Sequence, residues 1–495
     1  MSKIVRAYLW TMIGVAVLLA WTGSALAQET APAAEPAAPA VTEQEVIEVE
    51  VVEEQTPPPP PPSGLEFSPE VESFIAQLKQ PVPWFKWGVD QRLRDEYLHN
   101  VVFLNTHDNR APADENYGRW RTRLWGTLSP VEDIDINARL TWEWRNYCTP
   151  PGKLSINAEE SEVLLDTANV VWHNMFGQPV DMVVGRQDIV LGNGWLVLDG
   201  TPLDGSRTIY FDAVRFTAKL EESKTNIDLI YIDQAADPSD RVKPFNDQDA
   251  LVTEQDERGA ILWVTNKSLV PNAEVGGYFI YKHMNAEAAN GDTGNIYTYG
   301  GRITGDLDEH WNYYAELAQQ LGHKNRQDVC ALGFNSKLTY KFNDKYNNQL
   351  RVGYEFLSGD EPGTDSTNEA WDNLWGRWPQ FTEILIRTYT RETRIAQVTN
   401  MHRLGFGWTV YPHEKIEMCT DYNLLFADEN SYRDRWGFSD SGCFRGQLLS
   451  WLLRYKINKH VSGHLVSEFF FPGDYYTDES NDPAVFLRAE VVLSL

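Results

Sequence analysis

Residues 134–146 read IDINARLTWEWRN, and the alternation in this stretch decides the fold. Every second residue from Ile134 to Trp144 is apolar, whereas the residues between them, from Asp135 to Arg145, are polar or charged. A period of two is that of a β-strand, in which successive side chains point to opposite faces. The run is about twice as long as a typical globular strand. A strand that crosses a bilayer needs about nine to eleven residues, so this stretch fits a membrane strand.

The same alternation continues along the chain from residue 84 to the C-terminus. It is clear at 84–98 (WFKWGVDQRLRDEYL) and again at 350–356, 403–410, 416–426 and 487–495. Aromatic girdles mark the two interfaces of a membrane barrel, and Trp and Tyr residues gather near the ends of these strands. They are Trp84, Trp87, Trp142, Trp144, Trp172, Trp311, Tyr313, Trp408 and Tyr411. We therefore predict an all-β fold, a transmembrane antiparallel up-and-down β-barrel over residues 83–495.

The connections between these strands alternate between short turns and long polar loops. Short turns follow Ser129, Phe176, Leu220, Lys267, Asp306, Phe342, Tyr411 and Ile457. Long loops are expected at about 99–117, 148–161, 190–207, 236–256, 285–294, 322–328, 359–396, 428–443 and 472–483. Outer-membrane barrels have short periplasmic turns and longer external loops, so the pattern predicts about 18 strands with both termini in the periplasm. Residues 381–391 could pass for a further strand, but an even strand number places them in the longest loop, which is long enough to fold inward and constrict the pore.

The N-terminal 82 residues have a different character. Residues 1–27 have the basic start, apolar run and Ala-Leu-Ala end of a secretory signal peptide, with an uncleaved membrane anchor as the alternative. Residues 28–64 are rich in Ala, Pro and Glu and close with six prolines, so we expect a disordered, semi-rigid linker. Within 65–82, Ser68 and Pro69 suit a helix start, and the apolar residues share one face, which predicts a short periplasmic amphipathic helix. These apolar residues are Val71, Phe74, Ile75 and Leu78. Residues 28–82 could also engage a periplasmic export partner or the cell wall.

Charge and cysteine content exclude several functions. A formal net charge of -28 argues against nucleic acid as a partner, because binding a polyanion needs a basic surface. The four cysteines do not have the spacing of a zinc site or the density of a disulfide scaffold. They are Cys148, Cys330, Cys419 and Cys443. Cys330 and Cys443 fall at external strand ends and could pair. The acidic loops at 245–257 and 358–372 offer oxygen ligands for Ca²⁺ but lack EF-hand spacing, which favours solvated loops. Since the histidines are scattered, we expect no enzyme, metal site or cofactor.

Basic side chains are concentrated on the face of the first strands that we expect to point inward. Rings of Arg select anions in pores, and Arg pairs with carboxylates through a planar, permanently charged group. The candidate substrate path comprises Arg92, Arg94, Arg119, Arg121, Arg123, Arg139, Arg145 and Arg215. It would pass an anionic polysaccharide or small anionic solutes.

A structural role is the alternative for these arginines. Acidic residues share their faces, and ion-pair ladders between neighbouring strands stabilise large barrels. The acidic residues are Asp90, Glu96, Asp135 and Glu143. The second half of the barrel adds further carboxylates that would temper a uniform channel for polyanions, namely Glu316, Glu355, Glu417, Asp421, Glu468 and Glu490. The sequence leaves both interpretations open.

Residues 183–197 read VVGRQDIVLGNGWLV, which suggests a strand followed by a phosphate-binding loop. Val197 stands where such a loop needs its third glycine, and no helical pattern follows, so this interpretation is excluded. Together with RTIYFDAVRF at 207–216, the stretch resembles the alginate-export family of outer-membrane proteins, which carry a Gly-Arg-Gln strand, a glycine-containing loop and a Phe-Asp-Ala-Val-Arg strand. The resemblance implies a barrel of about 18 strands. It also adds Arg186, together with Arg215, as lumen-facing residues.

A fold shared with this family does not carry the substrate with it. We therefore expect a channel in the outer membrane of a Gram-negative-type bacterium, surrounded by outer-membrane lipids, with an anionic polysaccharide or a small anionic solute as its cargo. The alternative is a structural or adhesive barrel, tethered through its N-terminal extension, with its pore blocked by the long loop.

Overall fold

The computed structural model describes residues 66–495 except 109, 151–160, 199–209, 364–365 and 377–378. The signal peptide expected at 1–27 and the linker expected at 28–64 lie outside the described residues. Within the described residues, no helix is long and apolar enough to cross a membrane.

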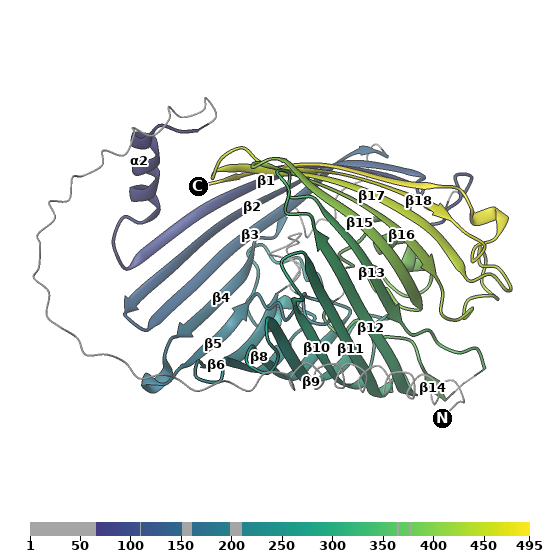
Figure 1. Cartoon of the computed structure of the whole chain (residues 1–495), viewed down its shortest axis with the longest axis horizontal. Coiled ribbons are helices and arrows are strands. Elements are labelled where there is room, and N and C mark those ends of the chain that lie inside the picture. The colour runs from purple at the N-terminus through teal and green to yellow at the C-terminus, as the bar shows by residue number, and fades with distance from the viewer. Residues whose placement is uncertain (1–65, 109, 151–160, 199–209, 364–365, 377–378) are drawn as a thin grey trace, which may run out of the picture. The chain divides into compact units, whose positions relative to one another are not determined.

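Eighteen long antiparallel strands form the wall of a closed barrel (Figure 1). They are β1 (Phe85–His99), β2 (Asp114–Val131), β3 (Ile134–Thr149), β4 (Leu164–Trp172), β5 (Val180–Gln187), β6 (Phe211–Leu220), β7 (Thr225–Gln234), β8 (Gln255–Asn266), β9 (Ala273–Ala286), β10 (Gly294–Asp306), β11 (Trp311–Lys324), β12 (Gln327–Lys341), β13 (Gln349–Leu357), β15 (Met401–His413), β16 (Ile416–Phe426), β17 (Phe444–Lys456), β18 (Val461–Pro472) and β19 (Ala484–Ser494).

Each strand pairs with its neighbours in the chain, and the first strand pairs with the last. The β1–β19 ladder runs from Asp90 opposite Ser494 to His99 opposite Val485 and closes the sheet. The two-residue strand β14 (Thr367–Asn368) lies in the loop after β13 and pairs in parallel with β12. The predicted all-β barrel with an even number of strands is therefore confirmed.

The connections follow the expected alternation except at one place. We predicted a long loop at 322–328, and this is wrong, because β11 ends at Lys324 and β12 begins at Gln327. The two connecting residues, Asn325 and Arg326, have φ angles of 49° and 73°. A two-residue hairpin turn needs positive φ at both positions because its backbone twist then matches that of the strands.

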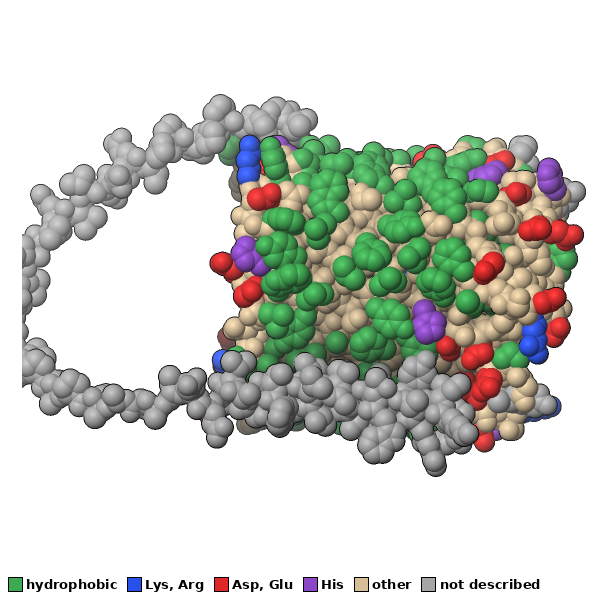
Figure 2. All heavy atoms as spheres, turned by 45° about the vertical axis from the view of Figure 1, so that its right-hand side comes forward, with side chains coloured by type: hydrophobic (Ala, Val, Ile, Leu, Met, Phe, Trp, Pro, Cys, Tyr) green, Lys and Arg blue, Asp and Glu red, His purple; other side chains and the backbone are tan. Residues whose placement is uncertain are grey.

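The outer face of the strands is apolar and the opposite face is buried. In β7, Leu229 and Tyr231 are 55% and 52% exposed, whereas the alternate residues Ile230 and Ile232 are buried. Figure 2 shows apolar side chains spread over the middle of this face and acidic side chains towards its two ends, more of them on the right. This is the arrangement that a lipid-facing surface requires.

The longest connection, which we call the inserted loop (residues 358–400), folds into the barrel. It contains β14, the short helix α5 (Ile384–Thr388) and the 3-10 turn η3 (Tyr389–Arg391). Its buried side chains form one hydrophobic cluster with residues 189–197 of the β5–β6 loop and with inward-facing residues of the wall. Trp371 stacks on Trp195 with a centroid separation of 5.2 Å, and Trp375 N donates to Leu196 O at 3.1 Å. The segment 381–391 is accordingly part of a loop and not a wall strand.

One helix precedes the barrel in the described residues. It is α2 (Pro69–Lys79), and Ser68 caps it by accepting a hydrogen bond from Val71 N at 3.5 Å. Trp87 Nε1 of β1 donates to Leu78 O at 2.7 Å and ties the end of α2 to the base of the wall.

The lipid-facing side of β7 should tolerate a charged residue less well than an exposed loop does. Leu229→Arg places a cation in the middle of a lipid-facing strand, and we expect it to lower the unfolding free energy in phospholipid vesicles by about 2–4 kcal/mol. Leu251 has a similar exposed fraction of 43% but lies in the β7–β8 loop, so Leu251→Arg should change stability by less than about 0.5 kcal/mol. Equal losses for the two variants in guanidinium titrations would contradict the lipid-facing assignment.

Candidate functional site

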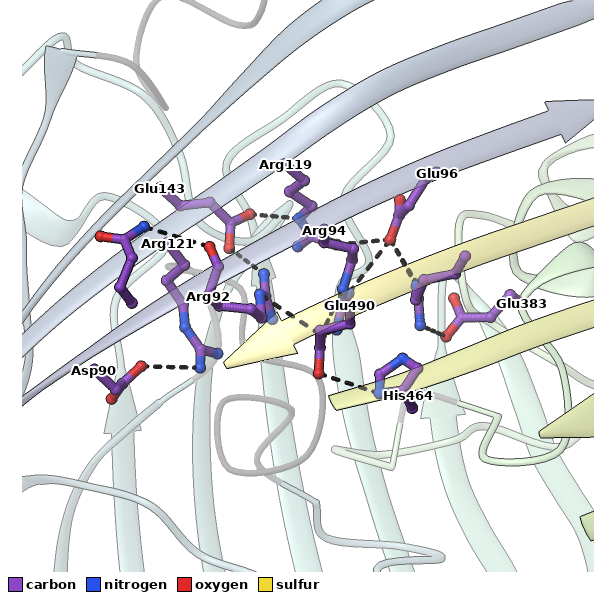
Figure 3. Close-up of polar contacts among 12 residues, drawn as sticks. Asp90, Arg92, Arg94, Glu96, Arg119, Arg121, Glu143, Glu383, His464 and Glu490 are labelled. Carbon is purple, nitrogen blue, oxygen red and sulfur yellow. Dashed lines mark hydrogen bonds and ion pairs between the residues drawn. The ribbon is translucent and has the colours of Figure 1, made fainter. Parts of the chain in front are cut away.

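A buried ion-pair network joins the first and last strands inside the barrel (Figure 3). Arg94 Nε of β1 donates to Glu490 Oε2 of β19 at 2.8 Å, and Arg488 Nε of β19 donates to Glu96 Oε1 of β1 at 2.8 Å. His464 Nδ1 of β18 lies 3.1 Å from Glu490 Oε1. The closing pair of strands is thus linked by side chains as well as by its backbone ladder.

The network continues onto β2 and β3. Glu143 accepts from Arg92 Nη2 at 3.0 Å and from Arg119 Nε at 2.8 Å. Arg121 Nη2 donates to Asp90 Oδ1 at 3.4 Å. All three of these arginines are buried. Burial of a charge is tolerated only when it is paired and hydrogen-bonded, and the alternating Arg and Glu side chains meet this requirement.

Two further predicted path residues also contact carboxylates on neighbouring strands. Arg139 Nε donates to Asp166 Oδ1 at 2.8 Å, and its Nη1 donates to Asp188 Oδ2 at 2.9 Å. Arg215 Nε donates to Asp228 Oδ1 at 2.8 Å. Asp166 and Asp228 lie on strands adjacent to those of their arginines, and Asp188 lies in the loop after β5, two strands from Arg139.

Arg186 joins the two motifs that carry the family resemblance. Its Nε and Nη2 donate to the two carboxylate oxygens of Asp212 at 2.9 and 3.0 Å, and its guanidinium lies 3.8 Å from the ring centroid of Tyr210. Of the remaining predicted residues, Arg123 is buried and Arg145 is half-buried. For the arginines with these carboxylate partners, the contacts favour the ion-pair ladder, and a role in the substrate path stays a prediction.

A cavity of about 960 Å³ lies between the inserted loop and the inner faces of strands in the β11–β19 half of the wall. Of the nine arginines singled out from the sequence, only Arg94 borders it. Six Lys or Arg and five Asp or Glu side chains border it among the described residues. The basic ones are Arg94, Lys337, Arg351, Arg403, Arg454 and Arg488, and the acidic ones are Glu355, Glu383, Glu417, Asp421 and Glu468.

In one part of the cavity wall, glycines occupy inward positions, and the side chains of Arg351, Arg403 and Asp421 lie over two of them. The strand register places Lys337 of β12, Gly353 of β13, Gly405 of β15 and Asn423 of β16 in a single row. All four border the cavity, as does Gly407. Adjacent strands lie about 4.8 Å apart, so the row is roughly 15 Å wide from the lysine to the asparagine. We call this row, with Gly407, the glycine trough.

Polar groups without partners occur in the glycine trough and elsewhere in the cavity wall. Among the described residues, the exposed ammonium group of Lys337 makes no ion pair or hydrogen bond. Three polar atoms that border the cavity are buried without a hydrogen-bond partner, namely Asn423 Nδ2, Ser450 Oγ and His464 Nε2. Buried polar groups normally have partners, so this set of groups is what a bound solute or ordered water would satisfy. The set is rich in donors and suits an oxygen-bearing anion.

Sequence reasoning missed the glycine trough, although a signal was present. In RLGFGW (403–408), glycines alternate with the apolar residues that face outward, so the glycines occupy the inward positions. Alternating inward glycines indicate a wall without side chains. Their meaning depends on the non-local register that aligns Gly353 with Gly405.

The inserted loop is attached to the wall on several sides. On the β18–β19 side, Thr382 Oγ1 donates to Glu468 Oε2 at 2.9 Å, and Arg488 Nη1 donates to Glu383 Oε1 at 2.8 Å. On β8, Glu257 Oε2 accepts from Trp375 Nε1 at 2.7 Å. These contacts hold the loop in the interior of the barrel.

Charge also fixes the inserted loop at β11 and β17. Lys324 Nζ donates to Asp372 Oδ2 at 2.7 Å, and Arg445 Nη1 donates to Glu392 Oε1 at 2.6 Å. Burial alone would raise the pKa of the Asp372 carboxyl, but Lys324 and Lys282 outweigh burial and hold its pKa below the ordinary value. Asp372 therefore remains ionised, and its ion pair remains intact, at neutral pH.

Within the described parts of the chain, no three His, Cys, Asp or Glu side chains are grouped so that they could hold a metal ion. All four cysteines are free, so the suggested pairing of Cys330 with Cys443 is absent.

Comparison with known proteins agrees with the closed barrel. The sequence matches the family described as "Alginate export" over residues 84–487. No curated protein matches the chain. Among solved structures, Pseudomonas aeruginosa OpdQ is similar with a TM-score of 0.52 and 9% identity, over 83% of this chain and 97% of that one. Pseudomonas aeruginosa OpdO is similar with a TM-score of 0.51 and 10% identity, over 83% and 97% of the two chains. At these identities the likeness shows the fold alone.

The ion-pair network predicts a large cost for removing one of its carboxylates. Glu490→Gln leaves Arg92 and Arg94 buried beside a neutral side chain, and we expect the unfolding free energy to fall by about 3–5 kcal/mol. The matched control is Asp233→Asn, which breaks an exposed pair with Arg241 at 2.9 Å and should cost about 1 kcal/mol or less. Guanidinium unfolding in vesicles measures both, and a loss for Glu490→Gln no larger than the control's would contradict the structural role.

Proposed function

The chain belongs to the alginate-export family of outer-membrane proteins, and on this premise we propose that it is a channel for anionic saccharides or other small anionic solutes. It lies in the outer membrane of a Gram-negative-type bacterium, as its family and its barrel indicate. The proposal concerns what passes through the barrel and where the solute contacts the wall.

The unpaired donors of the glycine trough are the observation that carries this proposal. Among the described residues, Lys337 presents a cation without a direct ion pair, and Asn423 presents an amide donor without an acceptor. A carboxylate or another anionic oxygen group would satisfy both kinds of donor. The cavity of about 960 Å³ that they border leaves room for the rest of the solute.

The charge of the cavity supports the same conclusion. Its described lining has one more basic than acidic side chain, whereas the whole chain has a net charge of -28. Arg403 adds a mixed surface, because its guanidinium lies 4.5 Å from the ring centroid of Phe381 while its Nε donates to Glu355 at 2.9 Å. Of the nine arginines predicted from the sequence, Arg94 is the candidate for direct contact with solute, since it alone borders the cavity.

A structural barrel with a closed pore is the second candidate, and the packing of the inserted loop favours it. Trp371, Leu374 and Trp375 are buried in the hydrophobic cluster inside the barrel. A loop with a packed core and several ion pairs opens less readily than one held by a few exposed contacts. Conductance of the intact protein and of variants with a loosened loop distinguishes a narrow channel from a closed barrel.

The charge of Lys337 should set ion preference. Lys337→Glu changes the local charge by two units, which at about 8 Å in a water-like medium alters the energy of a monovalent ion by roughly 1 kcal/mol, or about fivefold in preference. Planar-bilayer recordings in a salt gradient should show the reversal potential of the channel moving towards the equilibrium potential of the cation. Block of the current by alginate oligomers should weaken in parallel.

Lys345→Glu is the matched control for this experiment. Lys345 lies in the β12–β13 turn, outside the cavity, so the same charge change there should leave the reversal potential close to that of the wild type. If the two variants shift the potential equally, the trough does not determine selectivity.

Loosening the inserted loop should widen the path. Replacing both Trp371 and Trp375 with alanine removes the rings that pack on Trp195 and on Phe211, so single-channel conductance should rise above that of the wild type. Trp84→Ala, at an exposed tryptophan just before β1, is the control and should not change conductance. If only the double variant conducts, the pore of the wild type is closed. If neither the wild type nor the double variant conducts, the channel proposal is contradicted.

A further inference from the structure

Large apolar side chains surround the periplasmic end of the barrel. Six of its eight turns carry one that is between 42% and 77% exposed, either in the turn or at the adjoining strand end. These residues are Val131, Phe176, Leu220, Leu269, Leu307 and Phe342. Turn residues that face only water are usually polar. Apolar side chains at this position around the wall are suited to the interface of the inner lipid leaflet.

The two remaining turns lack such a side chain, and α2 or the residues just before it contact both of them. The β15–β16 turn offers Lys415, whose Nζ lies 3.0 Å from Glu66 Oε1 just before α2. In the β17–β18 turn, His460 Nε2 lies 3.1 Å from Glu72 Oε2 of α2, and its ring centroid is 5.2 Å from that of Phe67. The helix is therefore held at the stretch of the rim where the turns carry no strongly exposed apolar side chain.

The helix brings an apolar stripe to this stretch. Phe67 just before α2 and Val71, Phe74 and Leu78 within it are spaced at four, three and four residues and are 43–66% exposed. At 3.6 residues per turn, the stripe lies about 100° around the helix from the face of Glu72 and Ile75, which meets the barrel. Exposed polar residues, including Gln77, occupy the face opposite the barrel.

We propose that α2 lies in the interface of the inner leaflet of the outer membrane, with its apolar stripe in phospholipid. A helix in the corner between a barrel rim and a membrane surface needs two contact faces at about a right angle and a third face towards water. The three faces of α2 fit this requirement. The stripe would complete the apolar ring that the six other turns form.

Continuity with the lipid-facing wall favours lipid over a protein partner. Trp84, which is 54% exposed, follows α2 and begins the wall at β1. Trp at this level is typical of the membrane interface, because its ring is apolar and its indole N–H is polar. The proposal concerns the anchoring of the rim and is independent of what the channel carries.

Spin-label accessibility tests this placement in the full-length mature protein. The exposed Cys148, Cys330 and Cys443 are first replaced by serine, and a nitroxide is attached at Phe74→Cys or, in a matched variant, at Gln77→Cys. The protein is reconstituted into vesicles of phosphatidylethanolamine and phosphatidylglycerol. Oxygen concentrates in lipid and a charged nickel chelate in water, so their collision rates with the label report its surroundings.

The label at position 74 should collide several-fold more often with oxygen than with the nickel chelate, and the label at 77 should show the reverse. A label at Leu78→Cys should repeat the result for position 74. Preference for the nickel chelate at 74 would overturn the proposal by placing the stripe in water. Shielding from both reagents with an immobilised spectrum would overturn it in favour of a protein partner or a second copy of the chain.

Discussion

The pairing of β1 with β19 closes the sheet, and lipid leaves the chain no alternative to closure. An unpaired N–H or C=O group in the hydrocarbon region costs several kcal/mol, so a membrane sheet cannot have an open edge. The closing ladder joins residues about 400 positions apart, from Asp90–Ser494 to His99–Val485. The buried pairs of Arg94 with Glu490 and of Arg488 with Glu96 lie on the same two strands. Breaking either pair would leave a buried charge at the point where the barrel closes.

This constraint divides the interior of the barrel into two regions with different roles. Along β1–β3 and β19, buried Arg and Glu side chains contact one another in ion pairs, and of these Arg94 also borders the cavity. Along β12–β16, glycines replace inward side chains, and the donors of Lys337 and Asn423 have no partners. The inserted loop contacts both regions, since Glu383 pairs with Arg488 while Phe381 borders the cavity. The position of the loop is therefore coupled to the closing strands.

Most of the fold could be predicted from the sequence, because alternation is a local property. The pattern around Ile134 identified a strand and its inward face, and the same rule placed Arg92, Arg119 and Glu143 on one side. It failed at 322–328, where a two-residue turn was read as a long loop. The alternation of inward and outward side chains was also ambiguous near Arg186, where Gly185 adopts a φ of 116° and interrupts the regular strand.

The candidate site was less predictable because it depends on which strands are neighbours and how they are aligned. No local pattern in the sequence shows that Glu490 neutralises Arg94, or that Gly353 and Gly405 share a row with Lys337. The arginines drew attention by their number, yet we propose that Lys337, which makes no direct ion pair among the described residues, is the better contact for an anion. Bromide soaked into crystals and located by anomalous scattering tests this claim most directly. The account predicts peaks beside Lys337 and Asn423, and peaks at Arg92 and Arg119 with none in the glycine trough would contradict it.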